Sequence, residues 1–169
     1  MIENLYNGSR LTAHGSRLTA HGSRLRYCLV NESSQVKNIL IQFIKYFPDL
    51  EQRVKDIDSY SEKLSQHARV LCQYLEGECT GFAAYYANNI ENKTGYITLI
   101  VIHENFRRQG LGSKLIRECF DDMRYSDMKR VRLEVRKNNG GAIKFYESEK
   151  FILESESESG ESLYMTREL

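Results

Sequence analysis

A hydrophobic strand, a glycine-containing loop and an amphipathic helix follow one another in the middle of this chain. The run Tyr96–Ile102 is apolar and β-branched almost throughout, which predicts a strand in the centre of a sheet. In Ser113–Tyr125 the apolar side chains recur at helical spacing and form one stripe. Gly110 and Gly112 lie in the loop between them. This unit is typical of an α/β chain in which helices pack against a sheet.

The loop is suited to a phosphate or a pyrophosphate. Glycine lets the backbone turn tightly and approach a ligand closely. The amides that open the next helix point at such a ligand, and the helix dipole favours an anion there. Arg107 and Arg108 add positive charge. The Lys-Ser/Thr ending of a Walker loop and the G-x-G-x-x-G spacing of a dinucleotide site are both missing, so a bare turn with two glycines is the alternative.

Further strands and helices are expected on both sides of this unit, within one domain. The additional strands are expected at residues 26–30, 70–75, 81–87, 131–136, 151–154 and 163–166. The additional helices are expected from a cap at Ser33 or Ser34 to Pro48, and over residues 51–66 and 141–148. The last two strands should pair across the polar loop 155–162, and they could also pair between two subunits of a homodimer.

The N-terminal 25 residues are built from a repeat. Gly8–His14 reads GSRLTAH, Gly15–His21 repeats it, and Gly22–Leu25 begins a third copy. A glycine in every unit disfavours a coiled coil. We therefore expect residues 1–25 to form a mobile polar arm and residues 26–169 to form the single folded domain.

The same repeat can be written as DNA. Tandem copies of the seven-nucleotide unit GGCTCAC translate into Gly-Ser-Arg-Leu-Thr-Ala-His, and seven is not divisible by three. Gain or loss of one copy therefore shifts the reading frame. We expect the tract to be an on/off switch (phase variation) of a bacterial gene, and such genes most often alter the cell surface. An ordinary in-frame peptide duplication is the alternative.

Composition excludes several classes of protein. With 24 basic and 23 acidic residues the net charge is +1, which argues against a nucleic-acid partner. No apolar run approaches the roughly 18 residues of a membrane span, and a secretory signal is missing. The four cysteines form no C-x-x-C pair, and His and Cys are too scattered for a metal site. We expect a cytoplasmic protein with free thiols and without a metal.

Two motifs resemble the GNAT acyl-CoA N-acetyltransferase superfamily. Arg107, Gly110 and Gly112 match its hallmark Q/R-x-x-G-x-G/A, in the context of a preceding strand and a following helix. Residues 139–151 match its N-x-x-A-x-x-L/F-Y-E-x-x-G-F, except that Lys150 stands where glycine is usual, which puts the tight turn there in doubt. The resemblance covers residues 70–151 well. It implies a mixed, mostly antiparallel sheet of six to seven strands with about four helices.

The resemblance also implies where the cosubstrate acetyl-CoA binds. In this family the loop amides hold the pyrophosphate, which here implicates Arg107, Arg108, Gln109, Gly110, Leu111 and Gly112. The backbone of the preceding strand holds the pantetheine arm, which here implicates Ile100, Val101 and Ile102. Asn139 is expected to bond the same arm, with a turn-forming asparagine as the alternative.

Two side chains are candidates for proton transfer. Tyr146 matches the family tyrosine that protonates the departing thiolate, and a phenol with a pKa near 10 holds its proton at pH 7. A core tyrosine is the alternative. Glu134 matches the base of the ribosomal-protein-alanine acetyltransferases, the members nearest in motif. Its alternation with Arg132 and Arg136 also fits a plain charged ladder on a solvated face.

The resemblance predicts an enzyme that moves an acetyl group from acetyl-CoA to a primary amine by direct attack. The switch tract favours a small acceptor, such as an amino sugar of a surface-glycan pathway. Glu134 and its neighbours favour a protein N-terminus as the alternative acceptor. A CoA-binding sensor or partner protein without catalysis is the alternative of another class.

Overall fold

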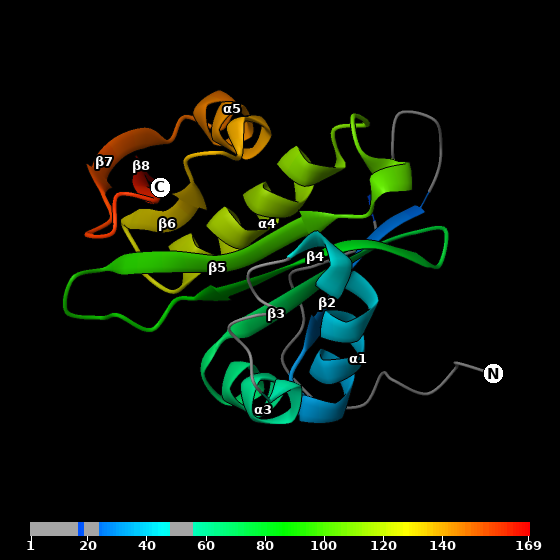
Figure 1. Ribbon diagram of the computed structural model, residues 1–169. Helices are drawn as coiled ribbons and strands as arrows, with labels where there is room; N and C mark the ends of the chain where they lie inside the picture. Colours follow the sequence, from blue (N-terminus) through cyan, green and yellow to red (C-terminus); the bar gives the residue numbers. More distant parts are fainter. Residues whose placement is uncertain (1–16, 19–23, 48–55) are drawn as a thin grey trace.

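A computed structural model describes residues 17–18, 24–47 and 56–169. The strands of these residues form one sheet in the order β1-β2-β3-β4-β5-β6-β8-β7 (Figure 1). Only the β5–β6 pair is parallel, so the sheet is mixed and mostly antiparallel, as expected. The strands are β1 (Arg17–Leu18), β2 (Arg24–Val30), β3 (Arg69–Leu75), β4 (Glu78–Tyr86), β5 (Thr94–Ile102), β6 (Arg130–Arg136), β7 (Ile152–Glu156) and β8 (Ser162–Glu168).

Helices cover both faces of the sheet. The helices are α1 (Ser33–Phe43), α3 (Ile57–His67), α4 (Leu111–Tyr125) and α5 (Gly140–Ser148), with 3₁₀ turns η1 (Ile44–Tyr46) and η2 (Glu104–Phe106). Figure 1 shows α4 and α5 on one face and α1 and α3 on the other. Among the described residues, the four α-helices and the seven strands longer than two residues agree with the expected architecture.

The alternation of side chains along β4 separates two hydrophobic clusters. Ala83 and Tyr85 belong to the cluster under α4, whereas Phe82 and Ala84 belong to the cluster under α1 and α3. Successive side chains of a strand point to opposite faces, so a central strand with helices on both sides is apolar throughout. All four of these residues are fully buried.

The first two helices differ from the expected boundaries. Glu32, and neither Ser33 nor Ser34, is the residue before α1, and it makes no side-chain cap bond. The helix tightens into η1 before Phe47. In α3 the Asp56 carboxylate accepts from the Asp58 amide at 2.9 Å, and this cap places the start at Ile57. Pro48 and residues 51–55 of the expected elements lie outside the described residues.

Two copies of the N-terminal repeat meet at the edge of the sheet. Arg17–Leu18 of the second copy pairs with Arg24–Leu25 of the third, in the register Arg17↔Leu25 and Leu18↔Arg24. Leu25 is buried in the core, so β2 begins two residues before the expected domain boundary. The rest of the expected arm, residues 1–16 and 19–23, lies outside the described residues.

The last two strands pair with each other as expected. The tight turn before β7 also forms, although Lys150 replaces the usual glycine. Lys150 adopts the left-handed conformation that favours glycine, with φ +65°. β7 is an edge strand of the sheet. A lysine at this position is thus compatible with the tight turn.

The four cysteines are free thiols. Cys72 and Cys119 are buried, whereas Cys28 and Cys79 are half-buried. In the part of the chain that the structure describes, no helix has the length and apolarity to cross a membrane. Within the same residues, no group of three or more His, Cys, Asp and Glu side chains could hold a metal ion.

Candidate active site

The candidate site begins where β5 separates from β6. These parallel strands pair from Thr94↔Arg130 to Ile97↔Leu133 and no further. Thr98 is skipped in the register between β4 and β5, which marks a β-bulge. A bulge bends a strand and increases its twist, so β5 turns away from β6 at this point. From Thr98 to Ile102 the backbone on the β6 side of β5 therefore has no strand partner.

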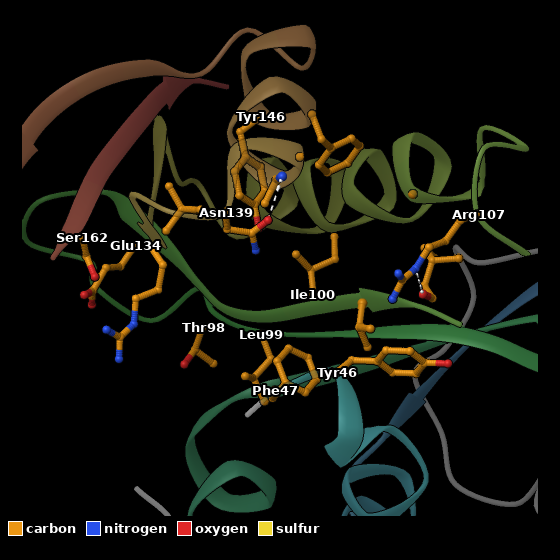
Figure 2. Close-up of a pocket in the computed structure, with 18 of the residues that line it drawn as sticks. Tyr46, Phe47, Thr98, Leu99, Ile100, Arg107, Glu134, Asn139, Tyr146 and Ser162 are labelled. Carbon is orange, nitrogen blue, oxygen red and sulfur yellow. Dashed lines mark hydrogen bonds between the residues drawn. The ribbon is translucent and has the colours of Figure 1, made fainter. Parts of the chain in front are cut away.

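A cavity of about 1370 Å³ occupies this divergence. Figure 2 shows it bordered by Asn139 and Tyr146 on one side and by Tyr46 and Phe47 on the other. Ten of the expected site residues line the cavity: Ile100, Val101, Ile102, Arg107, Arg108, Gly110, Gly112, Glu134, Asn139 and Tyr146. Unpaired backbone groups along one wall are what an amide-containing chain such as pantetheine needs for hydrogen bonding.

One end of the cavity is closed by the glycine loop, a name used here for residues 103–112. Gly110 precedes α4 with φ +73°, and a Cβ added there would meet no atom within 4 Å. The backbone at the start of the 15-residue helix α4 is therefore open to a ligand. A helix N-terminus favours an anion, so this end of the cavity fits a pyrophosphate.

Arg107 is held at the mouth of the glycine loop. Its Nε donates to the Ile102 carbonyl at 2.9 Å. Its guanidinium lies over the Tyr46 ring at 4.8 Å from the ring centroid. The Tyr46 hydroxyl in turn accepts from the Glu104 amide at 3.2 Å. Both contacts orient a positive charge beside the opening of α4.

Two residues of the loop point away from the cavity. The Gln109 side chain donates to the Asn105 carbonyl at 3.2 Å, inside the loop itself. The Leu111 side chain is 3% exposed and belongs to the core, because the first turn of α4 directs it toward the sheet. Neither lines the cavity, so of the expected cofactor residues these two lie outside it. Ser113 lines it instead, and only its place after Gly112 could have indicated that.

Tyr146 projects from α5 into the cavity. Its ring packs against Phe145 and Phe151, with ring centroids 5.4 Å and 5.6 Å away. The side chain is buried, and this burial raises the pKa of the phenol well above its ordinary value. The hydroxyl makes no hydrogen bond with any residue that the structure describes. Tyr146 is thus both a core residue and a neutral O–H donor facing the site.

Glu134 is exposed on the face of β6 that it shares with two arginines. Arg132 pairs with Glu154, and Arg136 pairs with Glu161 at 2.8 Å. The charged ladder that the alternation suggested is therefore present. Glu134 itself forms no ion pair with the described residues, and it lines the cavity. Figure 2 shows it with Ser162 at the end opposite Arg107.

Asn139 forms the turn before α5, which was the alternative to a role in binding the pantetheine arm. Its Oδ1 accepts from the Ala142 amide at 3.1 Å and caps α5. The cap leaves the Nδ2 group, which donates to none of the described residues. Because Asn139 also lines the cavity, the cap orients this amide donor toward the site.

The wall opposite α5 consists of residues that carry no motif. Tyr46 and Phe47 follow α1, Tyr60 lies on α3, and Tyr96 and Thr98 lie on β5. The Tyr60 hydroxyl bonds the Thr98 side chain, and burial raises the pKa of Tyr60. Nothing in the local sequence indicates that residues so far apart meet at one site.

Tyr85 and His103 have structural roles. Tyr85 is buried and donates to the Asp122 carboxylate at 2.7 Å. The ring of His103 packs between aromatic rings, and its Nδ1 accepts from the Asn105 amide at 3.3 Å. Neither residue lines the cavity.

The chain and its fold are similar to known proteins. A family model described as the acetyltransferase (GNAT) family matches residues 36–151, more than half of the chain. A search of curated protein sequences gave no significant match. The structural matches below are at low sequence identity and show the fold alone.

Three solved structures illustrate the shared fold. Ard1 from Thermoplasma volcanium has a TM-score of 0.68 at 20% identity, over 86% of this chain and 97% of its own. PaiA N-acetyltransferase from Thermoplasma acidophilum, in complex with coenzyme A, has a TM-score of 0.68 at 15% identity, over 85% of this chain and 99% of its own. A ribosomal-protein-alanine N-acetyltransferase from Escherichia coli has a TM-score of 0.62 at 18% identity, over 85% of this chain and 93% of its own.

Proposed function

Because the chain belongs to the GNAT acetyltransferase family, we propose that it transfers acetyl from acetyl-CoA to the primary amine of a small molecule. Membership makes it an acyl-CoA-dependent N-acetyltransferase. The proposed acceptor is an amino sugar of a surface-glycan pathway. One observation carries the assignment of the site: the divergence of β5 and β6 forms a cavity that runs from the α4 N-terminus, past Tyr146, to Glu134.

The residues present fit acetyl-CoA along this cavity. The opening of α4 with Arg107 and Arg108 would hold the pyrophosphate, since open backbone and positive charge coincide there. The β5 backbone from Thr98 to Val101, which has no strand partner on its β6 side, would hold the pantetheine arm, with the Asn139 amide group beside it. This places the thioester near Tyr146, beyond the pantetheine arm.

Catalysis requires proton transfer at both ends of the reaction. The acceptor amine attacks the thioester carbonyl carbon, an N–C bond forms, and the C–S bond breaks. The amine proton passes to the Glu134 carboxylate, directly or through water. The departing thiolate takes the phenolic proton of Tyr146, which burial keeps in place. Before the next cycle Glu134 releases the amine proton to solvent, and the Tyr146 phenolate takes a proton from solvent.

Several observations favour a small acceptor. The acceptor end of the cavity is lined by aromatic and polar side chains: Phe47, Tyr60, Tyr96, Thr98, Glu134 and Ser162. A concave site lined in this way is typical of small-molecule binding. A carboxylate and aromatic faces also suit a positively charged amine before it loses its proton. The repeat tract also supports a small acceptor, because a gene that is switched on and off fits an enzyme whose modification of the cell surface is dispensable.

The proposal includes the setting of the enzyme. Four free thiols fit the reducing cytoplasm, here of a bacterium that switches the gene on and off. A net charge of +1 supports a partner other than nucleic acid. A homodimer formed through the outer strand β7, where Ile152 and Leu153 are exposed, is part of the same proposal.

The switch can be tested on the gene itself. Identical DNA units of seven nucleotides in every repeat copy support the switch. Synonymous codon differences between the copies would support an ordinary in-frame duplication instead.

The acceptor can be tested in cells and with purified protein. One strain carries the tract locked in frame, and a second carries it locked out of frame. Mass spectrometry should show acetyl gained on a surface glycan in the first strain only. A gain solely at protein N-termini would support the protein acceptor. Purified full-length protein should release free CoA thiol from acetyl-CoA with amino sugars but not with peptides, and absence of turnover with every amine would support the non-catalytic alternative.

A further inference from the structure

A fully buried glutamine connects the sheet to the start of α4. The Gln73 side chain is 0% exposed, and its Nε2 donates to the Leu111 carbonyl at 3.1 Å and to the Tyr27 hydroxyl at 3.4 Å. A carbonyl only accepts hydrogen bonds, so the NH₂ group must face Leu111 and the Oε1 must face away. That Oε1 accepts from the Thr80 hydroxyl at 3.0 Å. Every polar atom of this side chain is therefore in use.

Thr80 owes its position to a β-bulge. Gln73 pairs with Gly81 and Tyr74 pairs with Cys79, so Thr80 has no directly opposite partner on β3. A bulge redirects the side chain of the extra residue. The Thr80 side chain is buried, and its single hydroxyl hydrogen also faces the Gln73 carbonyl, with 3.2 Å between the two oxygens. The bulge thus holds Thr80 against Gln73 through one hydroxyl hydrogen that the side-chain and backbone oxygens of Gln73 share.

Gln73 and Thr80 form hydrogen bonds with the two ends of the glycine loop. The Thr80 carbonyl accepts from the amide of His103, the first residue of the loop, at 2.8 Å. The Gln73 amide holds Leu111, the residue that opens α4. Between these two anchors lie the exposed residues Arg107 and Arg108 and the turn at Gly110. The ends of the loop are therefore connected through the Thr80 backbone carbonyl, the Thr80 hydroxyl and the Gln73 side chain as well as along the chain.

We propose that Gln73 and Thr80 are positioning residues that set the orientation of the glycine loop and thereby its affinity for the pyrophosphate of CoA. This inference rests on the proposed cosubstrate site. Anion binding at a helix N-terminus depends on where the first amides point. Hydrogen bonds inside a protein are strong and mutually reinforcing, so a buried pair can hold the loop in the binding conformation before the ligand arrives. Neither side chain lines the cavity, so neither touches the ligand.

Isosteric variants test the proposal in the full-length protein. Gln73→Met keeps a side chain of similar size but has no donor for the Leu111 carbonyl, and Thr80→Val removes the hydroxyl but keeps the shape. Each should weaken CoA binding by about tenfold or more, because a buried polar group loses its partner. Thr80→Ser keeps the hydroxyl and should bind CoA nearly as the unaltered protein does. Isothermal titration with CoA measures all four proteins.

A matched control separates positioning from general stability. Tyr85→Phe also removes a buried hydrogen bond from the sheet, the one to Asp122, but lies outside the loop and the cavity. It should keep the CoA affinity even where its melting temperature falls. Hydrogen exchange should be faster at the amides of residues 110–114 in Thr80→Val than in Thr80→Ser or Tyr85→Phe.

The outcomes distinguish this inference from the proposed function. If Arg107→Ala weakens CoA binding while Gln73→Met and Thr80→Val do not, the positioning role of Gln73 and Thr80 is refuted and the proposed cosubstrate site is supported. Equal losses of affinity in Tyr85→Phe and Thr80→Val would also refute the positioning role. If the unaltered protein binds no CoA, the proposed cosubstrate site fails, and this inference fails with it. If Gln73→Met does not fold, the comparison of Thr80→Val with Thr80→Ser remains decisive.

Discussion

The amide of Phe151 donates a hydrogen bond to the carbonyl of Tyr146, with 3.0 Å between nitrogen and oxygen. The Lys150 amide donates to the Glu147 carbonyl at 2.9 Å. These two bonds and the left-handed Lys150 form a Schellman motif at the end of α5, and the packing of Phe151 on the Tyr146 ring is its usual hydrophobic contact. The turn after α5 therefore fixes the side chain that we propose as the catalytic acid.

Lys150→Gly should stabilise the protein by about 1 kcal/mol, because a residue with a Cβ is strained at positive φ and glycine is not. Thermal unfolding followed by circular dichroism measures the change. Lys150→Ala is the control, since it removes the charge but keeps the Cβ, and it should not raise the melting temperature. An equal gain from both variants would attribute the effect to charge instead.

Tyr146→Phe should lower kcat by a factor of about 100 or more, since general acid catalysis contributes that much. The ring and its contacts with Phe145 and Phe151 remain, so the affinity for CoA should stay nearly unchanged. Steady-state kinetics and calorimetry with CoA check both parts. A kcat close to that of the unaltered enzyme would show that Tyr146 is only a core residue.

The pH dependence of kcat follows from the direction in which the pKa of Tyr146 is shifted. Burial raises the pKa of this phenol above its ordinary value near 10, so the folded enzyme keeps the proton to higher pH than a free tyrosine does. The acid is present below the raised pKa and is lost only above it. We expect kcat at saturating substrates to stay level from about pH 8 to 10, with circular dichroism confirming that the fold persists. A decline centred near pH 10 would contradict a shielded acid.

Glu134→Gln separates a base from a ladder residue. As the base, Glu134 should contribute a factor of about 100 to kcat. Glu154→Gln is the matched control, because it breaks the ion pair with Arg132 in the same ladder but lies outside the cavity. It should leave kcat within about twofold, since exposed ion pairs contribute little. Similar small effects from both variants would indicate that Glu134 is an exposed residue of β6 without a catalytic role.

Two glycine-to-alanine changes should act in opposite directions. A Cβ on Gly81 would lie 2.3 Å from the Val101 carbonyl oxygen, so Gly81→Ala must displace β4 from β5 and should cost about 2 kcal/mol or more. A Cβ on Gly140 would meet nothing within 4 Å, and Gly140→Ala should stabilise α5 by about 0.5–1 kcal/mol. Denaturant unfolding measures both. A tolerated Gly81→Ala would mean that the two strands are less closely packed than described.

Local sequence determined much of the fold and part of the site. The glycine loop, the amphipathic α4 and the hydrophobic β5 are each readable from neighbouring residues, because helix and strand periodicities act over a few positions. The motif at residues 139–151 located Asn139 and Tyr146, and the structure places both at the cavity. The orientations of Gln109 and Leu111 were less readable, since a hydrogen bond to Asn105 inside the loop directs Gln109 and the first turn of α4 directs Leu111.

The tertiary structure alone decided how the cavity is formed and supported. The bulge at Thr98 makes β5 leave β6, and a bulge is a property of the register between two strands. Tyr60 reaches Thr98, and Gln73 reaches Leu111, across 38 residues of sequence in each case. Sequence periodicity reports which face of an element is buried, but it does not report which distant element covers that face. The sequence therefore determined which elements form and where an anion can bind, whereas packing between distant elements determined the acceptor wall and the support of the loop.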